Sequence, residues 1–136
     1  MSHHVDEMLG THPSSATIDR DVLVEAIDSL TSCADTCTAC ADACLAEDQV
    51  SALRRCIRLN LDCADACRTT ATMLLRQTDP DRDVVRAAVE ACAQACRSCG
   101  GECERHAEKH EHCRVCADAC RRCADACERV LQALAA

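Results

Sequence analysis

The sequence predicts an all-α protein: an antiparallel, up-down-up-down four-helix bundle with a cysteine-lined core and a short N-terminal arm. Three observations support this prediction. Four long segments carry apolar residues or cysteine every three or four residues, which is the spacing of one helix face. The links between the segments are short, which favours antiparallel neighbours. The chain also has no aromatic residue and lacks the alternating β-branched runs of strands.

The expected organisation is a single domain preceded by a flexible arm. The arm would cover residues 1–16 and the bundle 17–136, with helices over about 18–46, 49–77, 80–105 and 110–134. Thr17 and Asp48 can cap the first two helices, and an Asp79-Pro80 step marks the start of the third. The turn before the fourth helix contains no proline or glycine, so its place is less sharply marked.

A glycine pair interrupts the expected third helix. Gly100 and Gly101 each cost about 1 kcal/mol relative to alanine inside a helix. Two explanations remain open: close approach of a neighbouring backbone, or fraying of the helix end.

The fourth segment carries a ladder of cysteines spaced 3, 4, 3 and 4 residues apart, at Cys113, Cys116, Cys120, Cys123 and Cys127. At about 100° per residue they fall within roughly 80° of one helix face and rise about 21 Å along it. Leucine is the residue expected at such buried seam positions. Thiols in its place predict one wall of an interior lined with soft-metal ligands.

The same unit recurs along the chain. Cys-Ala-Asp-Ala-Cys occurs four times, at 40–44, 63–67, 116–120 and 123–127. Cysteines at i and i+4 share a helix face with their Cβ atoms about 5–6 Å apart, whereas the aspartate between them faces water. The i,i+4 cysteine pairs are 33/37, 40/44, 63/67, 92/96, 99/103, 116/120 and 123/127.

The composition excludes several classes of function. A net charge of −8 opposes binding to nucleic acid and leaves no basic surface for an anionic membrane, and a chain without aromatic residues cannot stack bases. Sixteen cysteines in 136 residues would suit a disulfide scaffold in a secreted chain. We instead expect reduced thiols in the cytoplasm, because no segment resembles a signal peptide or a membrane span.

The position of the cysteines within each helix predicts a polarised bundle. They lie in the C-terminal halves of the first and third helices but begin near the N-termini of the second and fourth, so an antiparallel bundle gathers them at one end. His106, His110 and His112 lie in the turn at this end, where at least one would act in metal entry. Cys113 should lie near this mouth and Cys127 deepest. The opposite end should collect aliphatic side chains: Leu23, Ile27, Leu30, Leu74, Leu75, Val85, Val89, Leu131 and Leu134.

Thiolate ligands select Cu(I), zinc or iron–sulfur clusters. Zinc and clusters normally take their ligands from turning or loop backbone, whereas Cu(I) accepts two or three sulfurs and suits an i,i+4 pair on a straight helix. A zinc or iron–sulfur protein remains an alternative. So does a dithiol redox protein, although its Cys-x-x-Cys steps lack a βαβ context. Cysteine as mere core filler is disfavoured, because alanine or valine would fill the space without the risk of oxidation.

The Cys-x-x-x-Cys units on four helices and the histidine-bearing turn resemble the bacterial cytosolic copper storage proteins over about residues 17–136. The resemblance implies a cytoplasmic, non-catalytic homotetramer whose bundles each store multiple Cu(I) ions. Histidines near the open end, here His106, His110 and His112, would assist entry, and a copper chaperone or small thiol would donate or accept the metal. The ligands that the resemblance implies are Cys33, Cys37, Cys40, Cys44, Cys56, Cys63, Cys67, Cys92, Cys96, Cys99, Cys103, Cys113, Cys116, Cys120, Cys123 and Cys127.

Overall fold

The computed structural model describes residues 3–135, and every regular element within them is helical, which confirms the predicted all-α class. In chain order the elements are α1 (His3–Gly10), α2 (Arg20–Leu45), a 3₁₀ turn η1 (Val50–Leu53), α3 (Arg54–Leu75), α4 (Arg82–His106) and α5 (Glu111–Ala135). No helix in this part of the chain is long and apolar enough to cross a membrane.

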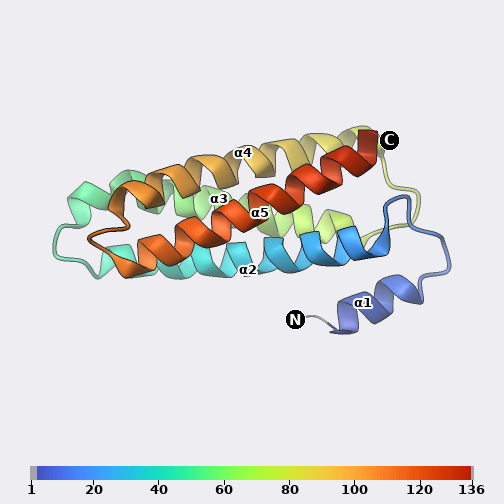
Figure 1. Cartoon of the computed structure of the whole chain (residues 1–136), viewed down its shortest axis with the longest axis horizontal. Helices are drawn as coiled ribbons and strands as arrows, with labels where there is room; N and C mark the ends of the chain where they lie inside the picture. The colour runs from blue at the N-terminus through green and yellow to red at the C-terminus, as the bar shows by residue number, and fades with distance from the viewer. Residues whose placement is uncertain (1–2, 136) are drawn as a thin grey trace.

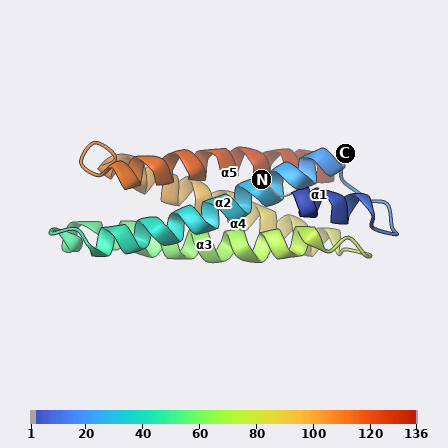
Figure 2. The same cartoon turned by 90° about the horizontal axis from the view of Figure 1, so that it is seen from below.

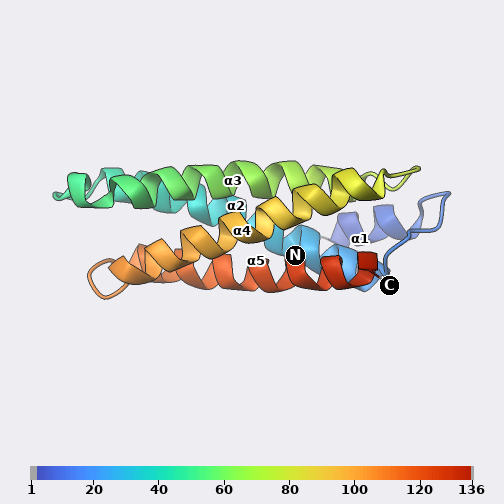
Figure 3. The same ribbon diagram turned by 90° about the horizontal axis from the view of Figure 1, so that it is seen from above.

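The four long helices lie side by side along the molecule (Figure 1). α2 packs against α3 and α5, and α4 packs against the same two helices, so each long helix contacts two neighbours. Figures 2 and 3, which show the molecule from below and from above, also show the four long helices lying along one another. In Figure 1 consecutive long helices run in opposite directions, and the α2–α3 and α4–α5 turns lie together at the left end.

The core changes character along its length. Cysteine seams fill the part nearer these two turns, and all sixteen cysteines are buried. Aliphatic side chains fill the other part, where Leu23, Leu30, Leu74 and Val130 are at most 1% exposed. Leu75, expected in this aliphatic end, is instead 39% exposed, because its neighbour Leu74 occupies the inward face of α3.

Two of the expected caps are replaced by aspartates two residues further on. Asp19, not Thr17, caps α2, where its carboxylate accepts a hydrogen bond from the backbone N–H of Asp21 at 2.8 Å. Asp81, not Asp79, caps α4. Asp79 precedes proline, which disfavours the α region, and it adopts a φ of 49°. The chain therefore turns first and enters the helix afterwards.

α3, the second long helix, begins later than expected and has no side-chain cap. Residues Val50–Leu53 form η1, and α3 starts at Arg54. The backbone N–H of Ala52 donates to the carbonyl of Gln49 at 3.0 Å. This i→i+3 bond of the 3₁₀ turn gives a partner to one of the backbone N–H groups that precede α3. Asp48 consequently does not cap this helix, since Gln49 stands at the boundary.

The glycine pair lies within a continuous helix, because α4 extends through it to His106. A Cβ added to Gly100 would lie only 3.1 Å from the Cβ of Cys120 on α5, whereas a Cβ on Gly101 would meet nothing within 4 Å. Gly100 therefore permits close approach of α4 and α5, and of the two explanations left open by the sequence the structure favours this one.

The N-terminal segment, expected as a loose arm, contains the eight-residue helix α1. It lies beside α2 (Figure 2). Asp6 of α1 forms an ion pair with Arg20 of α2 at 3.1 Å. Val5 and Leu9 are partly buried against the core. Because α1 has only eight residues, its apolar side chains form too short a repeat to be recognised in the sequence.

Candidate metal centre

All sixteen cysteines are free thiols, and none is more than 3% exposed. They come from all four long helices, since each helix turns a cysteine seam toward the shared interior. The i,i+4 spacing keeps successive thiols on one face, and the flanking alanines let the helices approach closely. The interior is therefore a buried compartment whose polar lining is mostly sulfur.

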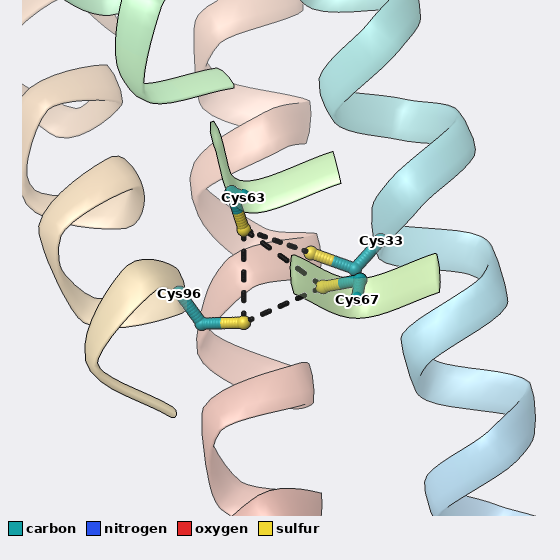
Figure 4. A group of neighbouring side chains, drawn as sticks. All are labelled: Cys33, Cys63, Cys67 and Cys96. Atoms are coloured by element: carbon teal, nitrogen blue, oxygen red, sulfur yellow. Dashed lines mark hydrogen bonds between the residues drawn. The ribbon is translucent and has the colours of Figure 1, made fainter. Parts of the chain in front are cut away.

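Four thiols from three helices illustrate the geometry (Figure 4). The Sγ of Cys63 lies 3.9 Å from Cys33, 3.9 Å from Cys67 and 3.7 Å from Cys96, and Cys67 lies 3.8 Å from Cys96. Two sulfurs that bind one metal ion at about 2.3 Å each are separated by a similar distance. The thiols are thus placed where small shifts would let them share an ion.

Neighbouring groups of this kind share members. Three further sets of four thiols have all Sγ atoms within 4.8 Å of one another: Cys33, Cys37, Cys63 and Cys120; Cys37, Cys99, Cys116 and Cys120; Cys67, Cys92, Cys96 and Cys123. Cys33 and Cys37 each belong to two sets. The interior is therefore a connected field of donors along the helices.

Asn60 is the polar residue within this field, and it is fully buried. Its side-chain oxygen accepts hydrogen bonds from the thiols of Cys99 at 3.0 Å, Cys116 at 3.3 Å and Cys103 at 3.5 Å. Its amide nitrogen donates to the sulfur of Cys56 at 3.8 Å. Asn60 takes the place of one thiol on the α3 seam and satisfies both ends of its amide with sulfur.

His112 joins the thiols at the end of the compartment beside the turns. Its Nδ1 lies 3.4 Å from the Sγ of Cys40 and 3.7 Å from the Sγ of Cys113. Together with Cys44 these residues form a candidate site of three thiols and one imidazole. Cys113, at the start of α5, lies at this mouth as expected.

Two carboxylates that the sequence analysis did not single out hold the histidines. Glu102 is buried and its Oε2 lies 2.9 Å from Nε2 of His106. Glu47 lies 3.0 Å from Nδ1 of His110 and 2.8 Å from Nε2 of His112. The i,i+4 spacing of Glu102 and His106 could have revealed the first pair, but Glu47 and His112 are 65 residues apart in the chain.

The expected entry histidines therefore differ in what they contact. His112 reaches the thiols of Cys40 and Cys113, whereas the contacts described for His106 and His110 are with carboxylates. Side-chain exposure is 18% for His106, 19% for His110 and 26% for His112, so all three are partly covered.

Burial keeps the thiols near the mouth protonated. It raises the pKa of the Cys44 thiol to about 11, and it also raises the pKa of Cys113. Hydrogen bonding from Cys103 acts in the opposite direction on Cys56 and lowers its pKa. A metal that enters this region must displace protons from most of the sulfurs that it binds.

The donor set suits a soft, monovalent metal. Thiolates favour Cu(I), an imidazole can add a further donor, and the negative charge of the thiolates is offset by each ion that binds. Sets of four thiols could also surround zinc tetrahedrally, with shared sulfurs bridging two ions, whereas Cu(I) needs only two or three of the sulfurs in a set.

The chain resembles proteins of known function. A family model described as copper storage protein matches residues 19–132. The structure of the copper storage protein Ccsp from Streptomyces lividans, loaded with 10 copper equivalents, is 50% identical, with a TM-score of 0.92 over 94% of this chain and 98% of that one.

Two related structures give similar agreement. A cytosolic copper storage protein from Streptomyces lividans with five coppers is 52% identical, with a TM-score of 0.81 over 82% of this chain and 93% of that one. A Ccsp variant with two histidines replaced by alanine is 49% identical, with a TM-score of 0.85 over 87% and 99% of the chains. A search of curated proteins gives no match.

Proposed function

The chain belongs to the copper storage protein family, and we propose that it stores multiple Cu(I) ions on the thiols of its interior. The observation that carries this proposal is the field of sixteen buried free thiols, in which sets of four sulfurs lie within 4.8 Å of one another. A store needs many soft donors protected from water and oxidants. The interior between the four long helices supplies both.

The proposed framework is an antiparallel, up-down-up-down four-helix bundle over residues 17–136, with residues 1–16 as an appended N-terminal segment. Contacts of each long helix with two neighbours support this arrangement. All sixteen cysteines would serve as copper ligands. Helix pairs on opposite sides of the bundle then contribute sulfurs to the same ions, which also ties the helices together.

We propose entry at the end that carries His106, His110 and His112. Support comes from His112, whose imidazole lies against Cys40 and Cys113 and is 26% exposed, so it connects solvent with the thiols. Ions would pass from this mouth toward Cys127, next to the aliphatic end. Replacement of the three histidines should slow uptake more than it lowers capacity.

Storage also fits better than catalysis. Every thiol is buried among other thiols, and a substrate larger than a metal ion would have no direct access to them. We propose a cytoplasmic location and a homotetramer, as in the family that the sequence resembles. A copper chaperone or a small thiol would deliver and remove the metal.

Anaerobic titration of the reduced chain with Cu(I), in the presence of a chelator that reports free metal, tests the proposal. The expected result is saturation at many ions per chain, with Cu(I) retained in competition with zinc. Saturation at one or two ions, or preferential loading with zinc, would overturn it. A variant with Cys33, Cys63, Cys67 and Cys96 changed to serine should lose several ions but keep the fold.

A further inference from the structure

A single carboxylate oxygen at the mouth contacts two imidazole rings. Oε2 of Glu47 lies 2.8 Å from Nε2 of His112 and 3.0 Å from Nδ1 of His110. The two rings are stacked with their centroids 5.5 Å apart. Glu47 follows α2, whereas the histidines stand at the start of α5, so these contacts join the two turns that surround the mouth.

The chemistry of the partners assigns the proton on His112. An ionised carboxylate can only accept hydrogen bonds. The side chain of Glu47 is 32% exposed and its carboxylate faces two imidazoles, so it is an ordinary ionised glutamate at neutral pH. Nε2 of His112 must then carry the hydrogen, and in a neutral imidazole the lone pair is left on Nδ1.

That lone pair faces the candidate metal ligands. Nδ1 lies 3.4 Å from the sulfur of Cys40 and 3.7 Å from that of Cys113. Metal-binding histidines commonly donate their other N–H to a carboxylate, which fixes the ring and its tautomer. We propose that Glu47 is a positioning residue that holds His112 in the Nε2–H tautomer, so that Nδ1 binds entering Cu(I) together with Cys40 and Cys113.

The same oxygen gives His110 the opposite tautomer. Nδ1 of His110 lies 3.0 Å from this oxygen, and the negative charge favours a hydrogen on Nδ1, which leaves the lone pair on Nε2. Two stacked imidazoles thus present different nitrogens to a metal while sharing one acceptor. The arrangement rests on the proposed copper storage function, but the tautomers themselves are properties of the metal-free protein.

Two-bond ¹H–¹⁵N correlation NMR on the reduced, metal-free full chain tests the tautomers directly. The expected spectrum shows an unprotonated Nδ1 for His112 and an unprotonated Nε2 for His110. A protonated Nδ1 on His112 in the unaltered protein would overturn the proposal. This measurement needs no variant and is independent of whether the protein stores copper.

Substitution then tests the consequence for metal binding. Glu47→Gln supplies a side chain that can donate as well as accept, so His112 should become a mixture of tautomers. The affinity of the Glu47→Gln variant for the first Cu(I) should fall about 10-fold to 100-fold, the usual effect of losing a carboxylate partner of a metal-binding histidine. X-ray absorption of the singly loaded protein should show loss of the nitrogen ligand, while total capacity stays unchanged.

Asp48→Asn is the matched control, because it removes the same charge from an exposed neighbour in the same turn. It should behave like the unaltered chain. An equal loss of Cu(I) affinity in both variants would mean that net charge causes the effect, and this would overturn the positioning role of Glu47. A Glu47→Gln variant in which the His112 tautomer and the nitrogen ligand are unchanged would overturn it too. Saturation of the unaltered chain at one or two ions would instead refute the storage function.

Discussion

The side-chain oxygen of Asn60 lies 3.0 Å from the sulfur of Cys99, so an amide on α3 accepts a hydrogen bond from a thiol on α4 in a fully buried position. Two other thiols point to the same oxygen, and a fourth sulfur accepts from the amide nitrogen. A buried amide requires such partners, whereas thiols are weak donors that tolerate their loss. Asn60 therefore needs the surrounding sulfurs as hydrogen-bond partners more than those sulfurs need Asn60.

This inequality predicts a mild effect of Asn60→Leu on the metal-free protein. Leucine has a similar shape and removes a buried polar group, so the free energy of unfolding should change by less than about 1 kcal/mol. Asn60→Ala should cost about 2 kcal/mol more, because it leaves a cavity. Anaerobic urea unfolding of the reduced variants measures both values. A loss above about 3 kcal/mol for Asn60→Leu would contradict the prediction.

The glycine pair gives a second prediction. Gly101→Ala should stabilise the protein by about 0.5–1 kcal/mol, because its Cβ meets open space and alanine favours the helix. Gly100→Ala should gain nothing or destabilise, since its Cβ would lie 3.1 Å from that of Cys120 and α4 would have to move away from α5. Thermal unfolding of the two single variants provides the comparison, and equal stabilisation of both would argue against close helix approach at Gly100.

The aliphatic end should carry stability without carrying metal. Leu74→Ala is expected to cost about 2–5 kcal/mol, because Leu74 is 1% exposed in a close-packed region. Leu75→Ala, at a site 39% exposed, should cost far less. Cu(I) capacity, measured by anaerobic titration on folded protein, should be the same in both variants. Reduced capacity in Leu74→Ala would show that the two ends are coupled.

Copper loading should release protons. Since burial raises the pKa of Cys44 to about 11 and also raises that of Cys113, both are thiols at neutral pH and must ionise to bind metal. Protons therefore compete with copper below these pKa values, and apparent affinity should rise with pH, about tenfold per unit for each proton released. A pH-indicator titration in weak buffer counts the protons. Loading without proton release would mean that thiolates exist beforehand.

Helix positions could be predicted because the signal is periodic. The cysteine and leucine seams repeat over many turns, so α2 to α5 lie close to the expected ranges. The helix starts were less predictable. Several aspartates near α4 can each act as a cap, and only the backbone turn at Asp79, with its φ of 49°, makes Asp81 the one that does.

The donor residues were visible in the sequence, but their partners were not. Helical spacing alone predicts that cysteines face inward, and all of them are buried. Which sulfurs meet depends on the relative rotation and offset of helices, which spacing within one helix does not determine. The contact between Glu47 and His112 depends on two turns meeting in space, so no local pattern announces it.

The sharing of thiols between neighbouring sets has a kinetic consequence. Cys33 and Cys37 each belong to two sets, so an ion bound in one set already touches a ligand of the next. Copper can therefore advance by exchanging one sulfur at a time, without ever becoming a free aqua ion inside the protein. Migration among these four sets would then meet a series of low barriers in place of one high one, so an ion that reaches any one of them could move on to the others.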